Sequence, residues 1–71
     1  MIDEIRKRLR RVPFVPFAVR TFDGHEYSVP TPDHAHISPR GNRVVVYDDE
    51  GTTAIIGLLH LNSVIEQSNG E

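Results

Sequence analysis

A run of basic residues near the N-terminus is the first candidate for chemistry in this chain of 71 residues. Five of the eight Lys and Arg residues fall within six consecutive positions: Arg6, Lys7, Arg8, Arg10 and Arg11. Guanidinium and ammonium groups neutralise phosphates, so the run predicts contact with a nucleic-acid backbone. The alternative, which we favour, is a solvated helix face on which the cations pair with Asp3 and Glu4. No aromatic residue interleaves the run, whereas surfaces that bind single strands carry stacking aromatics.

Four histidines raise the possibility of a metal site. His34 and His36 are two positions apart, so on a strand they share a face about 6.6 Å apart along the chain. A catalytic zinc ordinarily needs a third protein ligand, which His25 or His60 would have to supply. The alternative is that the residues beside His36 face the core and both rings face solvent, while His60 is packed in an apolar turn. We favour this alternative and expect no cofactor.

No pattern typical of an enzyme accompanies these residues. No serine lies in a Gly-x-Ser-x-Gly setting, and the five glycines are scattered at turns instead of forming a phosphate-binding loop. The absence of cysteine excludes thiolate zinc sites, cysteine nucleophiles and disulfides. The acidic stretch Asp48-Asp49-Glu50-Gly51 lacks the alternating oxygen ligands of a calcium loop and is explained by a hairpin turn. We therefore expect a non-enzymatic protein without catalytic residues.

Length and composition limit the fold that must position these groups. Seventy-one residues, 38% hydrophobic and 25% charged, are typical of one small globular domain with a thin core. The formal net charge of −2 gives no global attraction to nucleic acid or to an anionic membrane. No apolar run approaches the ~18 residues of a membrane span, and no signal-peptide apolar region follows the charged start. We predict a cytoplasmic protein that does not bind membranes.

The basic run is positioned by a predicted helix over residues 2–12. Ile2, Ile5, Leu9 and Val12 recur at helical spacing and form one apolar stripe. Pro13 ends the helix, because the residue before a proline is pushed out of the α region. The helix is too short to be stable alone, so it must dock on the rest of the domain.

Period-two alternation begins after Pro16 and predicts strands. Asp23-Gly24 separates two alternating runs, which is a strong hairpin signal because both turn positions need a positive φ. Residues 25–38 form one strongly bent strand or two short strands joined by a corner at Pro30 and Pro32. A buried strand over residues 43–47 and a return strand over residues 52–57 follow. A helical turn then precedes a last strand over residues 62–65.

This order predicts a mainly β fold with one N-terminal helix: a small five-stranded antiparallel barrel of the Src-homology-3 type. Barrel closure removes exposed strand edges, and the helix, with Phe14 and Phe17, would plug one open end. The single helix-capped barrel domain is expected to span residues 1–66. Residues 67–71 are expected to form a flexible polar tail.

The predicted topology resembles that of Sm-like proteins, which are ring-forming RNA binders with a helix, a bent second strand and a helical turn before the last strand. In that family, an acidic–apolar–Asn motif and an Arg-Gly motif bind bases. The corresponding residues here are Asp33-His34-Ala35-His36 and Leu59-His60-Leu61-Asn62, which supply neither motif. The resemblance therefore implies the fold more than it implies the base-binding site.

The chain is also similar to a group of small uncharacterised bacterial proteins. The similarity lies in Val12-Pro13-Phe14-Val15-Pro16-Phe17, Asp23-Gly24, Pro32-Asp33, Ser38-Pro39, the valine-rich strand and Leu58-Leu59-His60. It implies a natural independent domain and no particular function.

Two functions follow from these observations. The first is a non-enzymatic interaction module that forms homo-oligomers or binds another protein, because a thin core gains burial by association. The alternative is an Sm-like oligomeric RNA-binding protein that uses the basic helix.

Overall fold

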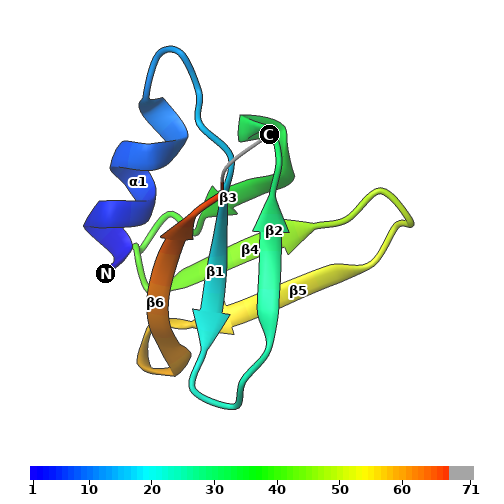
Figure 1. The fold of residues 1–71 in the computed structure, drawn as a ribbon. Helices are drawn as coiled ribbons and strands as arrows, with labels where there is room; N and C mark the ends of the chain where they lie inside the picture. Colours follow the sequence, from blue (N-terminus) through cyan, green and yellow to red (C-terminus); the bar gives the residue numbers. More distant parts are fainter. Residues whose placement is uncertain (68–71) are drawn as a thin grey trace.

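The computed structural model describes residues 1–67. Within these residues the order is α1 (Ile2–Arg10), β1 (Phe17–Thr21), β2 (Glu26–Val29), η1 (Pro32–His34), β3 (Ala35–Ile37), β4 (Arg43–Tyr47), β5 (Thr53–Gly57), η2 (Leu58–His60) and β6 (Leu61–Glu66). β1 pairs with β2 on one side and with β6 on the other, while β4 lies between β3 and β5. All of these pairings are antiparallel. Figure 1 shows the two sheets face to face, with β4 and β5 running across β1 and β2.

The helix forms where the sequence predicts it but ends earlier. Asp3 and Glu4 lie in its first turn and basic residues in its last turn, so both ends suit the helix dipole. The backbone of Arg11 is already extended, so α1 stops two residues before the predicted end at residue 12. Among residues 1–67, no helix is long and apolar enough to cross a membrane.

The predicted hairpins are confirmed, but in the Asp23-Gly24 turn only Gly24 has the positive φ that was expected at both positions. The β1–β2 turn contains Gly24 with a φ of 89°, and the β4–β5 turn contains Gly51 with a φ of 88°. Both values lie in the left-handed region, where glycine alone avoids a steric penalty from Cβ. Of the two alternatives for residues 25–38, the structure has the two short strands, which η1 at Pro32 separates.

The prediction of a five-stranded barrel is wrong. The described chain has six strands in two separate three-stranded sheets, and no strand pairing closes them into a barrel. Pro30 and Pro32 lack backbone donors and divide the bent strand, so each half belongs to a different sheet. On the opposite side, β5 runs across β2 and not along it, so the two edges cannot form a ladder (Figure 1).

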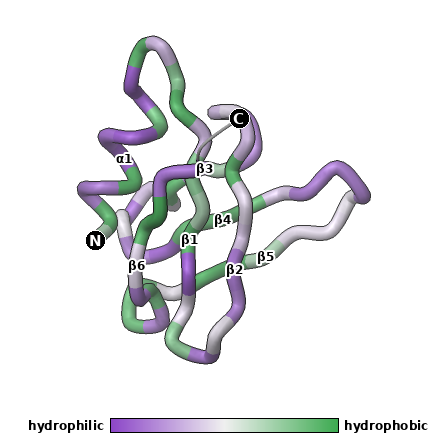
Figure 2. The backbone as a smooth tube through the Cα atoms, in the orientation of Figure 1, coloured by the Kyte–Doolittle hydropathy of each residue, from purple (hydrophilic) through white to green (hydrophobic). Residues whose placement is uncertain are grey.

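The core fills the space between the two sheets. Its fully buried side chains include Phe17, Val19, Val29 and Val44. Phe14 packs against this core, with its ring centroid 6.0 Å from that of Phe17. The two phenylalanines therefore serve as core residues of a sandwich and not as the plug of a barrel. Figure 2 shows hydrophobic segments where the sheets face each other and a hydrophilic loop between β4 and β5.

The two sheets meet at four corners, and the chain itself bridges two of them. β2 continues through η1 into β3, and β5 continues through η2 into β6. A third corner, between β3 and β6, is covered by α1, which packs against β3 (Figure 1). We call this the capped corner, formed by Ile2, Ile5, Arg8, strand β3 and Glu66 of β6. Ile2 and Ile5 are buried there, and Arg8 pairs with Glu66 at 3.3 Å.

Candidate functional site

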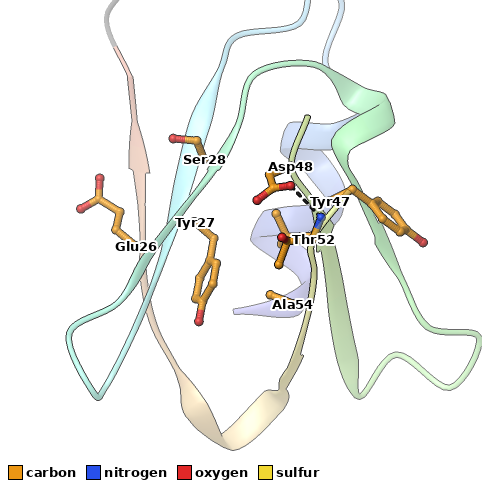
Figure 3. A pocket seen from close by; sticks show the side chains of 8 residues that line it. Glu26, Tyr27, Ser28, Tyr47, Asp48, Thr52 and Ala54 are labelled. Atoms are coloured by element: carbon orange, nitrogen blue, oxygen red, sulfur yellow. Dashed lines mark hydrogen bonds between the residues drawn. The ribbon is translucent and has the colours of Figure 1, made fainter. Parts of the chain in front are cut away.

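The fourth corner, between β2 and β5, is hollowed and has no covering element within residues 1–67. One hollow of about 210 Å³ lies between β2, the end of β4 and the start of β5 (Figure 3). A second, of about 330 Å³, lies between the β1–β2 turn, the end of β5 and η2. Tyr27 lines both hollows, so they adjoin at its ring. We call this region the open corner: Thr21, Asp23, Glu26–Ser28, Val46–Asp48, Thr52, Ala54–Gly57 and His60.

Tyr27 is the residue that lines both hollows of the open corner. It lies on the inward face of β2 opposite Val19 and packs against the core. Figure 3 shows its ring on one side of the first hollow, with Thr52 and Ala54 on the other side. Val46 and Ala54 are cross-strand partners on the inward face of the opposing sheet. The floor of the first hollow is therefore mainly apolar, whereas Thr21, Asp23 and His60 add polar groups to the second.

The edge of β5 presents unpaired backbone groups to the open corner. The Asp48 N–H donates to the Thr52 carbonyl at 3.0 Å, and the Leu58 N–H donates to the Asn42 carbonyl at 2.9 Å. Because residues of an antiparallel strand alternate in direction, the odd-numbered residues of β5 direct their N–H and C=O groups away from β4. These residues are Thr53, Ile55 and Gly57. Within the described part of the chain, no strand lies on that side of β5.

The other three strand edges carry features that block pairing. β2 bears the charged Glu26 and is followed by Pro30, which has no N–H to donate. β3 is only three residues long and lies beside α1. β6 bears Glu66, which Arg8 and Arg11 contact from the helix side. Natural proteins protect sheet edges with charges, prolines, short strands and covering helices. β5 contains no charge and no proline, and no described element covers it.

Exposed hydrophobic side chains gather at the same end of the molecule. Ile55 on β5 is 66% exposed, and Leu58 and Leu59 follow it on η2, with Leu59 87% exposed. The Phe22 N–H donates to the His60 carbonyl at 3.0 Å, so Phe22, 69% exposed, lies beside η2. Single exposed apolar residues are normal, but a group of them beside an unprotected strand edge is typical of an interaction surface.

Four residues of the predicted basic set are on α1 and Arg11 directly follows it. Three members of the set pair with carboxylates. Arg6 contacts Asp3 at 2.7 Å, and Arg8 contacts Glu4 at 2.9 Å. Arg11 lies 3.5 Å from Glu66, which Arg8 also contacts. Among the described residues, Lys7 and Arg10 make no ion pair. The positive charge of the helix is therefore largely balanced by carboxylates within reach.

The structure directs the two central histidines to different partners. His34 lies at the end of η1 and not on a strand, and its Nε2 is 2.8 Å from an oxygen of Asp49. Its Nδ1 is 2.7 Å from the Thr31 hydroxyl. His36 is exposed on β3, with its Nδ1 3.1 Å from the Tyr47 hydroxyl. Residues 1–67 hold no group of three or more His, Asp or Glu side chains suited to a metal ion.

The remaining two histidines lie near the open corner and do not join the first two. His25 pairs with Asp23 at 3.0 Å in the β1–β2 turn, and His60 is exposed on η2. Hydrogen bonds from the Thr21 hydroxyl, the His25 ring and the His25 N–H lower the pKa of Asp23 to about 2. These bonds stabilise the ionised carboxylate at the tip of the turn.

Sequence reasoning missed the open corner because barrel closure would have removed it. One signal was present: Ile55 and Ile56 are adjacent on a strand, so one of them must leave the core. The structure buries Ile56 and exposes Ile55. The second signal was the absence of any charged residue in β5, since charges commonly protect the edge of a sheet.

No protein-family model matches the chain, and neither a curated protein nor a solved structure does. The resemblance to small bacterial proteins and to Sm-like proteins therefore stays a prediction drawn from the sequence.

Proposed function

We propose that this protein is a non-enzymatic interaction module that binds an extended segment of polypeptide at the open corner. The observation that carries the proposal is the unprotected edge of β5 beside an apolar groove. Backbone N–H and C=O groups at such an edge bind an added strand, and adjacent pockets accept alternate side chains of that strand. Residues Thr53, Ile55 and Gly57 would supply the backbone bonds, and Tyr27 would contact an inserted side chain.

The proposal includes a cytoplasmic location. The fold is built without cysteine, so it has no need of an oxidising compartment. The bound segment belongs either to a second copy of this chain or to another protein.

The experiment is a screen of extended peptides followed by NMR titration of the labelled protein. Peptides with alternating apolar residues should shift the amide signals of Thr53, Ile55, Gly57 and Tyr27 and leave those of α1 unchanged. The variant Ile55→Lys should lose binding, because a charge on this edge opposes strand addition. His36→Lys is the matched control, since His36 lies in the same cross-strand row on the same outer face, at the opposite edge of the sheet.

Shifts confined to α1, or the absence of binding by every peptide of the screen, would contradict the proposal. Equal binding by the wild type and Ile55→Lys would contradict it as well.

The alternative of an oligomeric RNA-binding protein is the weaker proposal, because Asp3, Glu4 and Glu66 balance much of the helix charge. It is tested with single-stranded RNA by fluorescence anisotropy at several salt concentrations. If α1 binds phosphates, Lys7→Ala combined with Arg10→Ala lowers the affinity, and the salt slope falls by roughly 0.7 for each phosphate that is no longer neutralised. Equal affinity and slope for the variant and the wild type would exclude this helix as the RNA-binding surface.

A further inference from the structure

We infer, on the basis of the proposed function, that the segment bound at the open corner is β5 of a second copy of this chain. The two β5 strands pair in antiparallel orientation around a twofold axis at Ile55. Thr53 then lies opposite Gly57 of the second copy, and Ile55 lies opposite its own counterpart. Two three-stranded sheets thereby become one continuous six-stranded sheet.

The backbone groups of β5 are suited to this pairing. The outward-facing residues Thr53, Ile55 and Gly57 are spaced evenly about Ile55, so a twofold axis there brings every outward N–H opposite a carbonyl. An interface with twofold symmetry requires such a self-complementary patch. The edges of β2, β3 and β6 are protected by charge, proline or the helix, so they do not offer an equal alternative.

The side chains of β5 also suit the pairing. Ile55 lies beside Val45 on the outer face of its sheet. The twofold axis places the two Ile55 side chains next to each other and extends this apolar row into the second copy. Gly57 has no side chain of its own, and the His60 ring lies 3.5 Å from the position that its Cβ would take, so Thr53 of the second copy faces this ring. β5 carries no charge, so no like charges meet across the axis.

The exposed turn η2 and the first hollow lie at equal distances along the chain from Ile55, where the twofold axis passes. Leu58 begins the exposed apolar turn η2 three residues after Ile55, and Thr52 lines the first hollow three residues before it. The antiparallel register therefore brings Leu58 and Leu59 of each copy to the end of β5 at which the hollow of the other copy opens. The apolar turn η2 of one copy and the first hollow of the other copy therefore meet across the twofold axis.

The charge distribution favours the same arrangement. The acidic loop with Asp48, Asp49 and Glu50 projects beyond β2 at one end of β5 (Figure 1). In the antiparallel pair the two acidic loops lie at opposite ends, so their repulsion is small. A parallel pair would place the loops side by side.

The first test is sedimentation equilibrium of the full chain with two matched variants. The wild type and His36→Lys should form dimers of equal stability. Ile55→Lys should weaken the dimer at least about tenfold, which corresponds to about 1.4 kcal/mol. Ile55 is 66% exposed, so the variant should keep the circular dichroism spectrum of the wild type. A dimer that Ile55→Lys does not weaken overturns the inference, as does a wild type that stays monomeric or forms a larger closed ring.

The second test uses disulfide formation, since the chain has no cysteine of its own. The Cα atoms of a hydrogen-bonded antiparallel pair lie about 5.5 Å apart. This separation falls within the range of about 4.4–6.8 Å that a disulfide spans. Ile55→Cys should therefore form a linked dimer on oxidation. Thr53→Cys should not, because the two copies of residue 53 lie more than about 13 Å apart. Equal cross-linking of both variants, or of neither, overturns the register.

The two proposals fail in different ways. A monomeric wild type that still binds peptides at the open corner keeps the interaction module and overturns pairing with a second copy. A monomer that binds no peptide overturns both.

Discussion

The capped corner and the open corner are equivalent positions in the fold, yet one is covered and the other is not. At each of these corners, an edge strand of one sheet lies near an edge strand of the other, and the two strands are not consecutive in the chain. At the capped corner, Ile2 and Ile5 of α1 are buried, and Arg8 forms ion pairs with carboxylates of α1 and β6. At the open corner, β5 keeps its backbone groups unpaired and Ile55 exposed. Within the described residues, the chain covers the capped corner itself and leaves the edge of β5 unpaired at the open corner.

The difference shows how a helix of nine residues changes the use of a sheet edge. A short amphipathic helix removes apolar surface and brings charges to the edge that it covers. Without it, the same kind of edge becomes a template for a further strand. Three changes to single residues test this comparison, in order of expected size.

The largest effect is expected for Ile5→Ala in the capped corner. Ile5 is a fully buried residue of α1, so its truncation to alanine should lower the free energy of unfolding by about 2–5 kcal/mol. Urea unfolding followed by circular dichroism measures the loss. Ile55→Ala in the open corner is the control. It should change the stability of the monomer by less than about 0.5 kcal/mol. Losses of equal size would show that the two corners do not differ in burial.

A smaller effect is expected for Arg8→Ala. The Arg8 side chain contacts both Glu4 and Glu66, so its loss should cost about 0.5–1 kcal/mol at low salt. Added salt should shrink the difference from the wild type, because it screens exposed charges. Arg10→Ala removes a cation from the same helix that has no ion pair among the described residues, and should leave stability unchanged. An Arg8→Ala loss that is independent of salt would assign the role of Arg8 to packing instead of charge.

The smallest effect is a pH dependence at the turn beside the open corner. The pKa of Asp23 is lowered from 3.8 to about 2 in the folded chain, chiefly by the Thr21 hydroxyl. A lowered pKa means that this interaction stabilises the fold above pH 3.8 and that the contribution is lost as the pH falls through about 2. When urea midpoints are measured at a series of pH values, Asp23→Asn should lack the pH dependence that the ionisation of Asp23 contributes.

A second variant separates the causes of this shift. Thr21→Val removes the largest contribution, so NMR titration should show the pKa of Asp23 closer to 3.8. An unchanged pKa in that variant would assign the shift to His25.

The sequence predicted most elements because their signals are local. Gly24 and Gly51 marked the hairpins, alternation marked the strands, and Leu58 to His60 formed the predicted helical turn. The boundaries moved by one or two residues, as at Arg11. Local patterns specify which face of each element is buried.

Barrel closure could not be predicted in this way. It depends on whether β2 and β5 lie along or across each other, and no residue on either strand encodes that angle alone. The open corner was missed for the same reason. Its parts, from Tyr27 to His60, are distant in sequence and meet only through the crossing of the sheets. The histidines were hard to place for a related reason, since His34 falls on η1 and its partner Asp49 on a distant loop.

The order of the strands has a consequence for the sequence in which the two sheets fold. Sheet β3-β4-β5 is contiguous in the chain, so its strands can pair through contacts that are local in sequence. Sheet β2-β1-β6 must wait, because β1 pairs with the last strand of the chain. Contacts between distant residues form slowly. During that interval the edge of β5 is complete while the core is not.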